Sequence, residues 1–126
     1  MKILFFIIAI IMSSQAGQLQ FEHNFKTALQ KAKKQNKEVM MMYSAKWCPE
    51  CNYMKDVVFK DAKISKYIQQ HFIFLSLDIQ KDELPNGFEY VGIPTFFFIR
   101  NDTKMIGKII GGDRVDRFFE KLRDIK

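Results

Sequence analysis

The chain has 126 residues, of which 48% are hydrophobic and 27% charged, with a formal net charge of +6 and two cysteines. This length fits one domain with a substantial core of its own. The positive charge fits a solvated surface or an acidic partner better than nucleic-acid binding, because the lysines within residues 31–37 resemble the wet face of one helix. We therefore expect no nucleic-acid site. We also expect the protein to be a monomer.

The N-terminal segment has the pattern of a secretory signal. Lys2 gives a basic start, residues 3–12 form an apolar run, and small residues follow. A spanning helix needs ~20 apolar residues, so this run is too short to cross a bilayer comfortably. We expect cleavage after Ala16, which makes residues 1–16 a signal peptide and residues 17–126 the mature domain. The mature protein would be exported, either to the periplasm or as a secreted protein.

The first half of the mature domain alternates between helix and strand. Apolar residues recur at helical spacing from Phe21 to Ala32 and predict a first helix, which the polar segment 33–37 ends. The apolar run Val39–Tyr43 predicts a strand that is buried on both faces. A second helix is expected from Pro49, and a further helical segment around residues 64–68. The residues of the second helix that should face inward are Met54, Val57 and Val58.

The second half of the domain adds three strands and a helix. Residues 72–79 read as another buried strand, and residues 95–100 and 104–110 as two strands joined by a short turn. An amphipathic helix then spans residues 115–122, with Asp113 as its expected N-cap. Parallel pairing of the first two strands through a crossover helix, with the hairpin on the other side, predicts an α/β fold with a mixed sheet.

Cys48 and Cys51 lie where the first predicted strand turns into the second helix. In open α/β sheets the reactive site lies at the carboxyl ends of the strands. The first thiol would face unpaired backbone N–H groups and the positive end of the helix dipole, which favour the nucleophilic thiolate. Cys51 follows one helical turn later, where it can resolve a mixed disulfide while shielded from solvent. The pattern predicts a redox pair.

Two other interpretations of the cysteine pair fit the sequence less well. A structural disulfide between neighbours so close in sequence would constrain the unfolded chain little and would stabilise the fold little. A zinc site needs about four ligands, and no second pair accompanies these cysteines, because His23 and His71 lie far apart in the sequence. We therefore expect neither a metal ion nor another bound cofactor.

Two motifs in this order resemble the thioredoxin superfamily: Trp47-Cys48-Pro49-Glu50-Cys51 and, further on, Gly92-Ile93-Pro94-Thr95. The likeness extends over essentially the whole mature chain. The segment Val39–Cys48 is similar to exported thioredoxin-like proteins and to the C-terminal domain of the membrane thiol-disulfide interchange reductase. The resemblance implies a thioredoxin fold, with a central mixed sheet of four to five strands flanked by helices on both faces. It also implies that Cys48 is the nucleophile and Cys51 the resolving thiol.

The resemblance further implies how the site is completed. The Ile93–Pro94 bond is expected to be cis and to pack beside Cys48, with the Ile93 backbone open to a client peptide. A shallow groove would be completed by Trp47 and the glycines that follow residue 110. The candidate substrate-binding residues are Ile93, Pro94, Thr95 and Gly111. The residues expected to tune the redox pair are Trp47, Pro49 and Glu50.

Two positions depart from the family pattern. Many thioredoxins bury an acid six residues before the first cysteine, and this chain has Met42 there. The lysine that usually accompanies the acid would fall near Phe74. Glu50 is the nearby carboxylate visible in the sequence, and its charge should disfavour the thiolate, while Lys46 and Lys55 offset part of that effect.

These features predict a thiol-disulfide oxidoreductase that acts on disulfide-containing client proteins as a reductant or a mild isomerase. The resemblance implies a membrane thiol-disulfide interchange protein as the electron donor. Two alternatives stay open at this point. One is a dithiol oxidase, since reduction potentials in this chemistry span a wide range. The other is a thioredoxin-like module that binds clients without catalysis.

Overall fold

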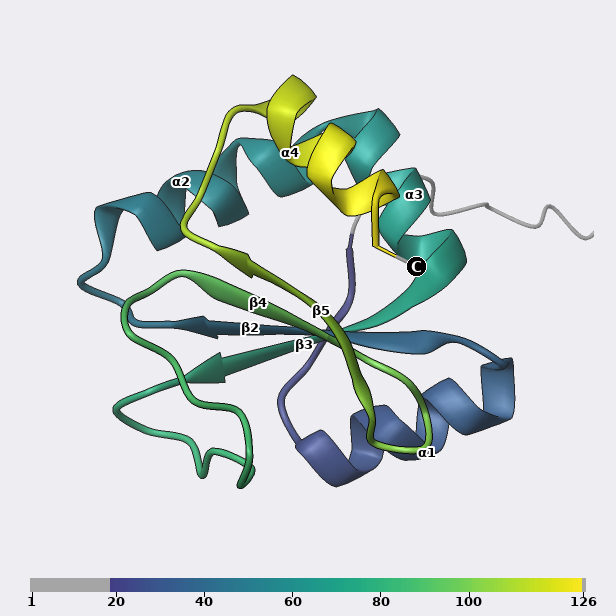
Figure 1. Ribbon diagram of the computed structural model, residues 1–126. Coiled ribbons are helices and arrows are strands. Elements are labelled where there is room, and N and C mark those ends of the chain that lie inside the picture. The colour runs from purple at the N-terminus through teal and green to yellow at the C-terminus, as the bar shows by residue number, and fades with distance from the viewer. Residues whose placement is uncertain (1–18, 126) are drawn as a thin grey trace, which may run out of the picture.

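A five-stranded mixed sheet runs through the centre of the molecule, in the order β1-β3-β2-β4-β5 (Figure 1). The computed structural model describes residues 19–125, and the predicted signal peptide at residues 1–16 lies outside them. Strand β2 pairs in parallel with β3 and antiparallel with β4, while β5 completes the hairpin with β4. The expected thioredoxin fold with a mixed sheet is confirmed.

The helices and strands alternate along the chain before the closing hairpin. The strands are β1 (Phe21–Glu22), β2 (Glu38–Ser44), β3 (Phe72–Asp78), β4 (Thr95–Ile99) and β5 (Met105–Ile110). The helices are α1 (Phe25–Gln35), α2 (Pro49–Asp56), the short 3-10 helix η1 (Val58–Lys60), α3 (Ala62–His71) and α4 (Val115–Arg123). No helix among residues 19–125 is long and apolar enough to cross a membrane.

Both faces of the sheet are covered, which explains why β2 is a continuous apolar run. Successive strand residues point to opposite faces, so Met40 and Met42 join the cluster beneath α2, α3 and α4. Val39, Met41 and Tyr43 face the other side, where α1 and the segment between β3 and β4 lie. In Figure 1 α1 lies below the sheet, and α2, α3 and α4 lie above it.

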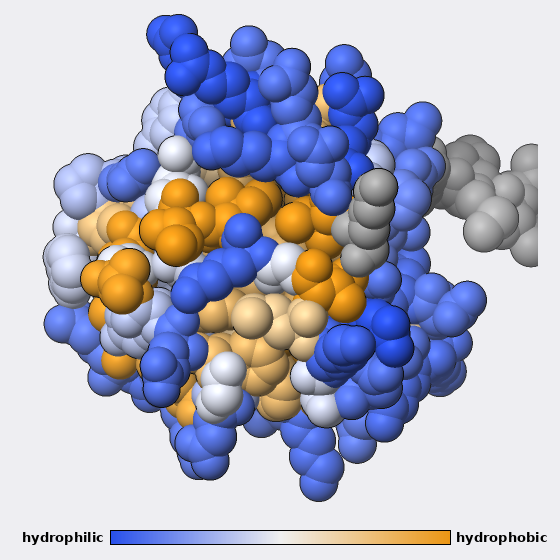
Figure 2. Space-filling model, in the orientation of Figure 1, coloured by the Kyte–Doolittle hydropathy of each residue, from blue (hydrophilic) through white to orange (hydrophobic). Residues whose placement is uncertain are grey.

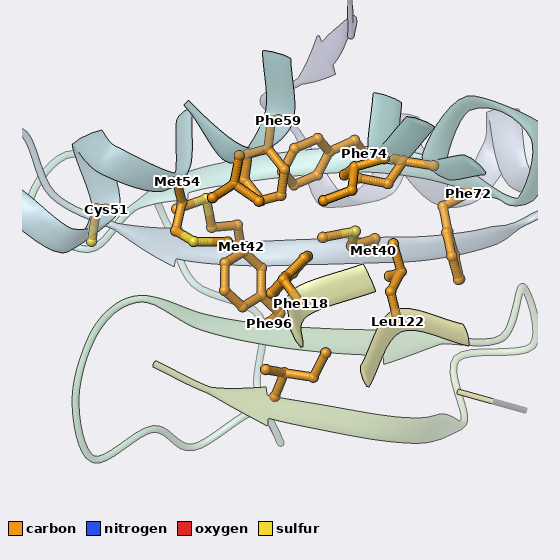
Figure 3. Packing of buried hydrophobic residues seen from close by; sticks show 14 of the residues in the cluster. Met40, Met42, Cys51, Met54, Phe59, Phe72, Phe74, Phe96, Phe118 and Leu122 are labelled. Carbon is orange, nitrogen blue, oxygen red and sulfur yellow. The ribbon is translucent and has the colours of Figure 1, made fainter. Parts of the chain in front are cut away.

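The cluster beneath α2, α3 and α4 is rich in aromatic rings. Phe59 lies at its centre and meets Phe74 and Phe96 with ring centroids 5.0 and 5.8 Å apart, at steep interplanar angles of 77° and 84°. Edge-to-face pairs of this kind stabilise a core beyond their buried area. Figure 3 shows these rings packed with Met42 and Met54, and Cys51 at one end of the cluster. Cys51 is therefore packed against the apolar side chains of this cluster.

Three local predictions need correction. Phe21 lies in β1, where it pairs with Phe74, so the first helix begins only at Phe25 after the N-cap Asn24. Val57 was expected to face inward, yet it is 47% exposed because α2 ends just before it and η1 changes the chain's direction.

The third correction concerns the start of α4. Arg114 occupies its N-cap position without a side-chain hydrogen bond, whereas Asp113 was the expected cap. The Asp113 carboxylate instead accepts a hydrogen bond from the Arg114 backbone N–H and forms an ion pair with Lys121 at 2.9 Å. The hydrogen bond from Lys121 and, to a smaller extent, the one from the Arg114 N–H lower the pKa of Asp113.

Candidate active site

Cys48 lies between the end of β2 and the start of α2, as the sequence predicted. It is the N-cap residue of α2, and its Sγ accepts a hydrogen bond from the Cys51 backbone N–H at 3.1 Å. Pro49 occupies the first helical position, where its missing N–H costs no hydrogen bond and its fixed φ suits a helix. The local sequence thus directs one of the free N–H groups of the helix, that of Cys51, toward the sulfur of Cys48.

The two cysteines form a disulfide with their Cα atoms 5.2 Å apart. Cys51 is fully buried, whereas Cys48 retains 4% exposure, so Cys48 is the more accessible residue of the pair. Cys51 belongs to the apolar cluster that also contains Met42 and Met54 (Figure 3). The expectation that Cys51 is turned inward is confirmed.

The second motif packs against the first. The Ile93–Pro94 bond is cis, as the resemblance implied, and the Ile93 carbonyl oxygen lies 3.9 Å from Cys48 Sγ. The side chain of Thr95 is fully buried and donates a hydrogen bond to the Gly92 carbonyl at 2.7 Å. Thr95 therefore braces this loop from within, while the substrate-binding role expected of it stays a prediction.

A third segment closes the site from the end of β5. Gly111 has a φ of +84°, a conformation that glycine adopts without steric cost, and its N–H donates to the Pro94 carbonyl at 2.8 Å. The next amide, that of Gly112, donates to Glu50 Oε1 at 2.8 Å. The sequence placed Glu50 beside the redox pair, but nothing in it identified this partner 62 residues away.

Exposed apolar side chains surround this junction. Trp47 is 61% exposed, as expected of a groove wall. Val91 is 90% exposed two residues before Ile93, and Ile110 is 58% exposed opposite Thr95 in the β4–β5 register. Figure 2 shows apolar side chains gathered over β5. Val91 and Ile110 were not predicted from the sequence as part of the site. Their closeness in sequence to Ile93 and Gly111 was the one feature that could have identified them.

The charges near the redox pair come mainly from lysines. The neighbouring Lys81 side chain lowers the pKa of Lys46, two residues before Cys48, while the charge of Asp78 acts in the opposite direction. On α2, Lys55 Nζ donates to Ser44 Oγ at 3.0 Å. These cations border the end of β2 from which the redox loop begins.

Both departures from the family pattern lie in the apolar core. Met42 is fully buried and Phe74 is 2% exposed, and both belong to the same cluster as Cys51. A charged side chain at either position would lack water to solvate it. Within residues 19–125, no three His, Cys, Asp or Glu side chains lie close enough together to hold a metal ion.

Comparison with known proteins was made on both sequence and structure. A family model for a thioredoxin-like domain matches residues 25–126. Thioredoxin H4 from Arabidopsis thaliana is 30% identical over 111 residues, which cover 83% of this chain and 88% of that protein. The thiol:disulfide interchange protein DsbD from Campylobacter jejuni is 23% identical over 115 residues, 87% of this chain. The chain spans only 20% of DsbD and 21% of the TPR repeat-containing thioredoxin TDX of A. thaliana.

Solved structures give the same result. A putative disulphide-isomerase from Bacteroides thetaiotaomicron superposes with a TM-score of 0.75 at 26% identity, covering 87% of this chain and 94% of that one. The oxidised C-terminal domain of DsbD from Neisseria meningitidis has the same fold, with a TM-score of 0.66 at 19% identity over 85% of this chain and 100% of that one. With its Cys48–Cys51 pair at the start of α2, the chain belongs to the thioredoxin superfamily of disulfide oxidoreductases.

Proposed function

We propose that this protein reduces or isomerises disulfides of client proteins outside the cytoplasm, with Cys48 as the nucleophile. The observation that carries the proposal is the hydrogen bond from the Cys51 N–H to Cys48 Sγ at the N-terminus of α2. In the reduced protein the same N–H and the helix dipole would stabilise a thiolate at Cys48.

The reaction is a pair of thiol-disulfide exchanges. The Cys48 thiolate attacks one sulfur of a client disulfide, which forms a mixed disulfide and releases the other client sulfur as a thiolate. Cys51, after losing its proton, then attacks Cys48 Sγ, which releases the second client thiolate and forms the Cys48–Cys51 disulfide. Two electrons have passed from this protein to the client, and water protonates the released thiolates.

Client binding is proposed at the segment before Pro94. The Ile93 backbone lies next to Cys48 and can pair with an extended peptide in the manner of an added strand. The exposed side chains of Trp47, Val91 and Ile110 offer apolar contacts around that peptide. Such a site recognises a backbone and apolar neighbours, which suits clients of varied sequence.

The reducing direction is supported by Glu50, whose carboxylate lies in the first turn of α2 and disfavours a second negative charge at Cys48. The cations of Lys46 and Lys55 favour the opposite direction and keep a dithiol oxidase as the second candidate. A reductant needs an electron donor, and we assign this role to a membrane thiol-disulfide interchange protein, in keeping with the likeness to DsbD.

Equilibration with glutathione and dithiothreitol buffers tests the direction, with the fraction of oxidised protein measured by alkylation and mass shift. We expect a reduction potential nearer to the ~−270 mV of thioredoxin than to the ~−120 mV of DsbA. A potential close to that of DsbA would establish the oxidase instead. A protein that reacts with neither buffer would contradict both.

Export is proposed from the signal pattern of residues 1–16. Expression of the full chain in a bacterial host, followed by mass spectrometry of the mature protein, tests it. We expect an N-terminus at Gly17 in the periplasmic or secreted fraction. Retention of residues 1–16 on a cytoplasmic protein would contradict the proposal.

A further inference from the structure

Glu50 joins two parts of the site that lie far apart in the sequence. It is one of the two residues between the redox cysteines and lies in the first turn of α2. Its Oε1 accepts the backbone N–H of Gly112, at 2.8 Å, on the segment between β5 and α4. The carboxylate is therefore committed to a specific partner, although the residue is exposed.

The packing around Gly112 is shaped to admit this carboxylate. A Cβ atom at position 112 would lie 2.9 Å from Glu50 Cγ and 3.1 Å from both Glu50 Oε1 and Met54 Cγ. The first of these approaches is shorter than real Cβ atoms show and the other two are tighter than most, so a larger residue here would require the Glu50 side chain to shift. The adjacent Asp113 N–H lies 3.5 Å from the sulfur of Met54, which gives the segment a second contact with α2.

The same segment contacts the loop that borders Cys48. Gly111 donates to the Pro94 carbonyl at 2.8 Å, and the carbonyl of Ile93, one residue earlier, lies 3.9 Å from Cys48 Sγ. The contacts form a closed ring, from α2 through the Gly111–Gly112 segment to the Ile93–Pro94 loop and back to Cys48. Within this ring, the Glu50–Gly112 hydrogen bond is made by an exposed side chain, so a substitution can remove it without disturbing the core.

We propose that Glu50 is a positioning residue. Its hydrogen bond to Gly112 holds the Ile93–Pro94 loop, which we call the client-binding edge, in place beside Cys48. The inference rests on the proposed function, because the edge matters only if a client binds there. What the hydrogen bond requires is an acceptor oxygen, and the negative charge is not needed for it. A glutamine can supply that oxygen and an alanine cannot.

Three variants separate the hydrogen bond from the charge. Glu50→Gln removes the charge and keeps an acceptor, Glu50→Ala removes both, and Glu120→Ala is the matched control on the exposed side of α4. The direct readout is the hydrogen exchange of the Gly112 amide, followed by NMR. We expect this amide to exchange about tenfold faster in Glu50→Ala, and to keep wild-type protection in Glu50→Gln and Glu120→Ala.

The functional readout is the kinetics of insulin reduction in the presence of dithiothreitol. Glu50→Ala should raise KM about fivefold with little change in kcat, because the edge is displaced while the cysteines are intact. Glu50→Gln should keep KM within about twofold of the wild type. A KM in Glu50→Gln as high as that in Glu50→Ala would assign the effect to the charge and overturn the proposal.

A double-mutant cycle with Gly112→Ala completes the test. The added Cβ should displace Glu50, so Gly112→Ala alone should raise KM, and Glu50→Ala should add little to it. Additive effects, or unchanged exchange of the Gly112 amide in Glu50→Ala, would show that the hydrogen bond does not position the edge. The exchange measurement needs no turnover. A protein that fails to reduce insulin would refute the proposed function, whereas the exchange of the Gly112 amide would still decide whether Glu50 holds this segment.

Discussion

Cys48 and Cys51 share one disulfide but differ in their surroundings, and this difference predicts their reactivity. Cys48 has the residual exposure and accepts the Cys51 N–H, whereas Cys51 is buried against Met42 and Met54. In the reduced protein Cys48 should therefore react first with iodoacetamide near neutral pH. Cys51→Ser should accumulate mixed disulfides with clients, all through Cys48. Mass spectrometry of partly alkylated protein checks the order, and faster labelling of Cys51 would reverse the assignment.

Glu50 also carries a charge, and its effect on the thiolate is separate from its hydrogen bond. A negative charge in the first turn of α2 disfavours the Cys48 thiolate, so Glu50→Gln should lower the pKa of the Cys48 thiol. The change should be small, because solvent and salt screen an exposed carboxylate. A more stable thiolate makes the disulfide a stronger oxidant, so the reduction potential should rise. An ultraviolet thiolate titration identical to the wild type would show that the charge does not set the potential.

At the scale of elements, α2 begins with an unusual cap. Cys48 occupies the N-cap position, where serine is among the preferred residues and alanine is not. Cys48→Ser and Cys48→Ala both abolish the disulfide, so their difference isolates the cap. We expect the serine variant to have a free energy of unfolding about 1 kcal/mol greater than the alanine variant. Urea denaturation measures this difference, and equal midpoints would mean that the residue 48 side chain contributes nothing to the start of α2.

The elements also show where prediction from sequence succeeds. The apolar run of β2 and the turn between β4 and β5 were placed within a residue or two, because burial and turn chemistry are local signals. The start of α1 was misplaced because Phe21 lies four residues before Phe25, a helical spacing. Its strand geometry follows from pairing with Phe74, with ring centroids 4.7 Å apart, which is a contact between distant segments.

At the scale of the whole molecule, the two motifs were enough to identify the fold and the redox pair. Their meeting point was expected from the resemblance, and the 3.9 Å approach of Ile93 to Cys48 agrees with it. The Glu50–Gly112 hydrogen bond and the exposure of Val91 could not be predicted in this way. Both depend on where the segments after β3 and β5 lie in space, and no local pattern encodes those positions.

The catalytic roles of Cys48 and Cys51 are the central claim, and the rate of insulin disulfide reduction by dithiothreitol tests them most directly. The wild-type protein should accelerate the reaction, and Cys48→Ser should reduce the rate to that of dithiothreitol alone, because the remaining thiol, that of Cys51, is fully buried. Cys51→Ser should be slowed as well, with mixed disulfides accumulating. A Cys48→Ser variant as active as the wild type would contradict the account.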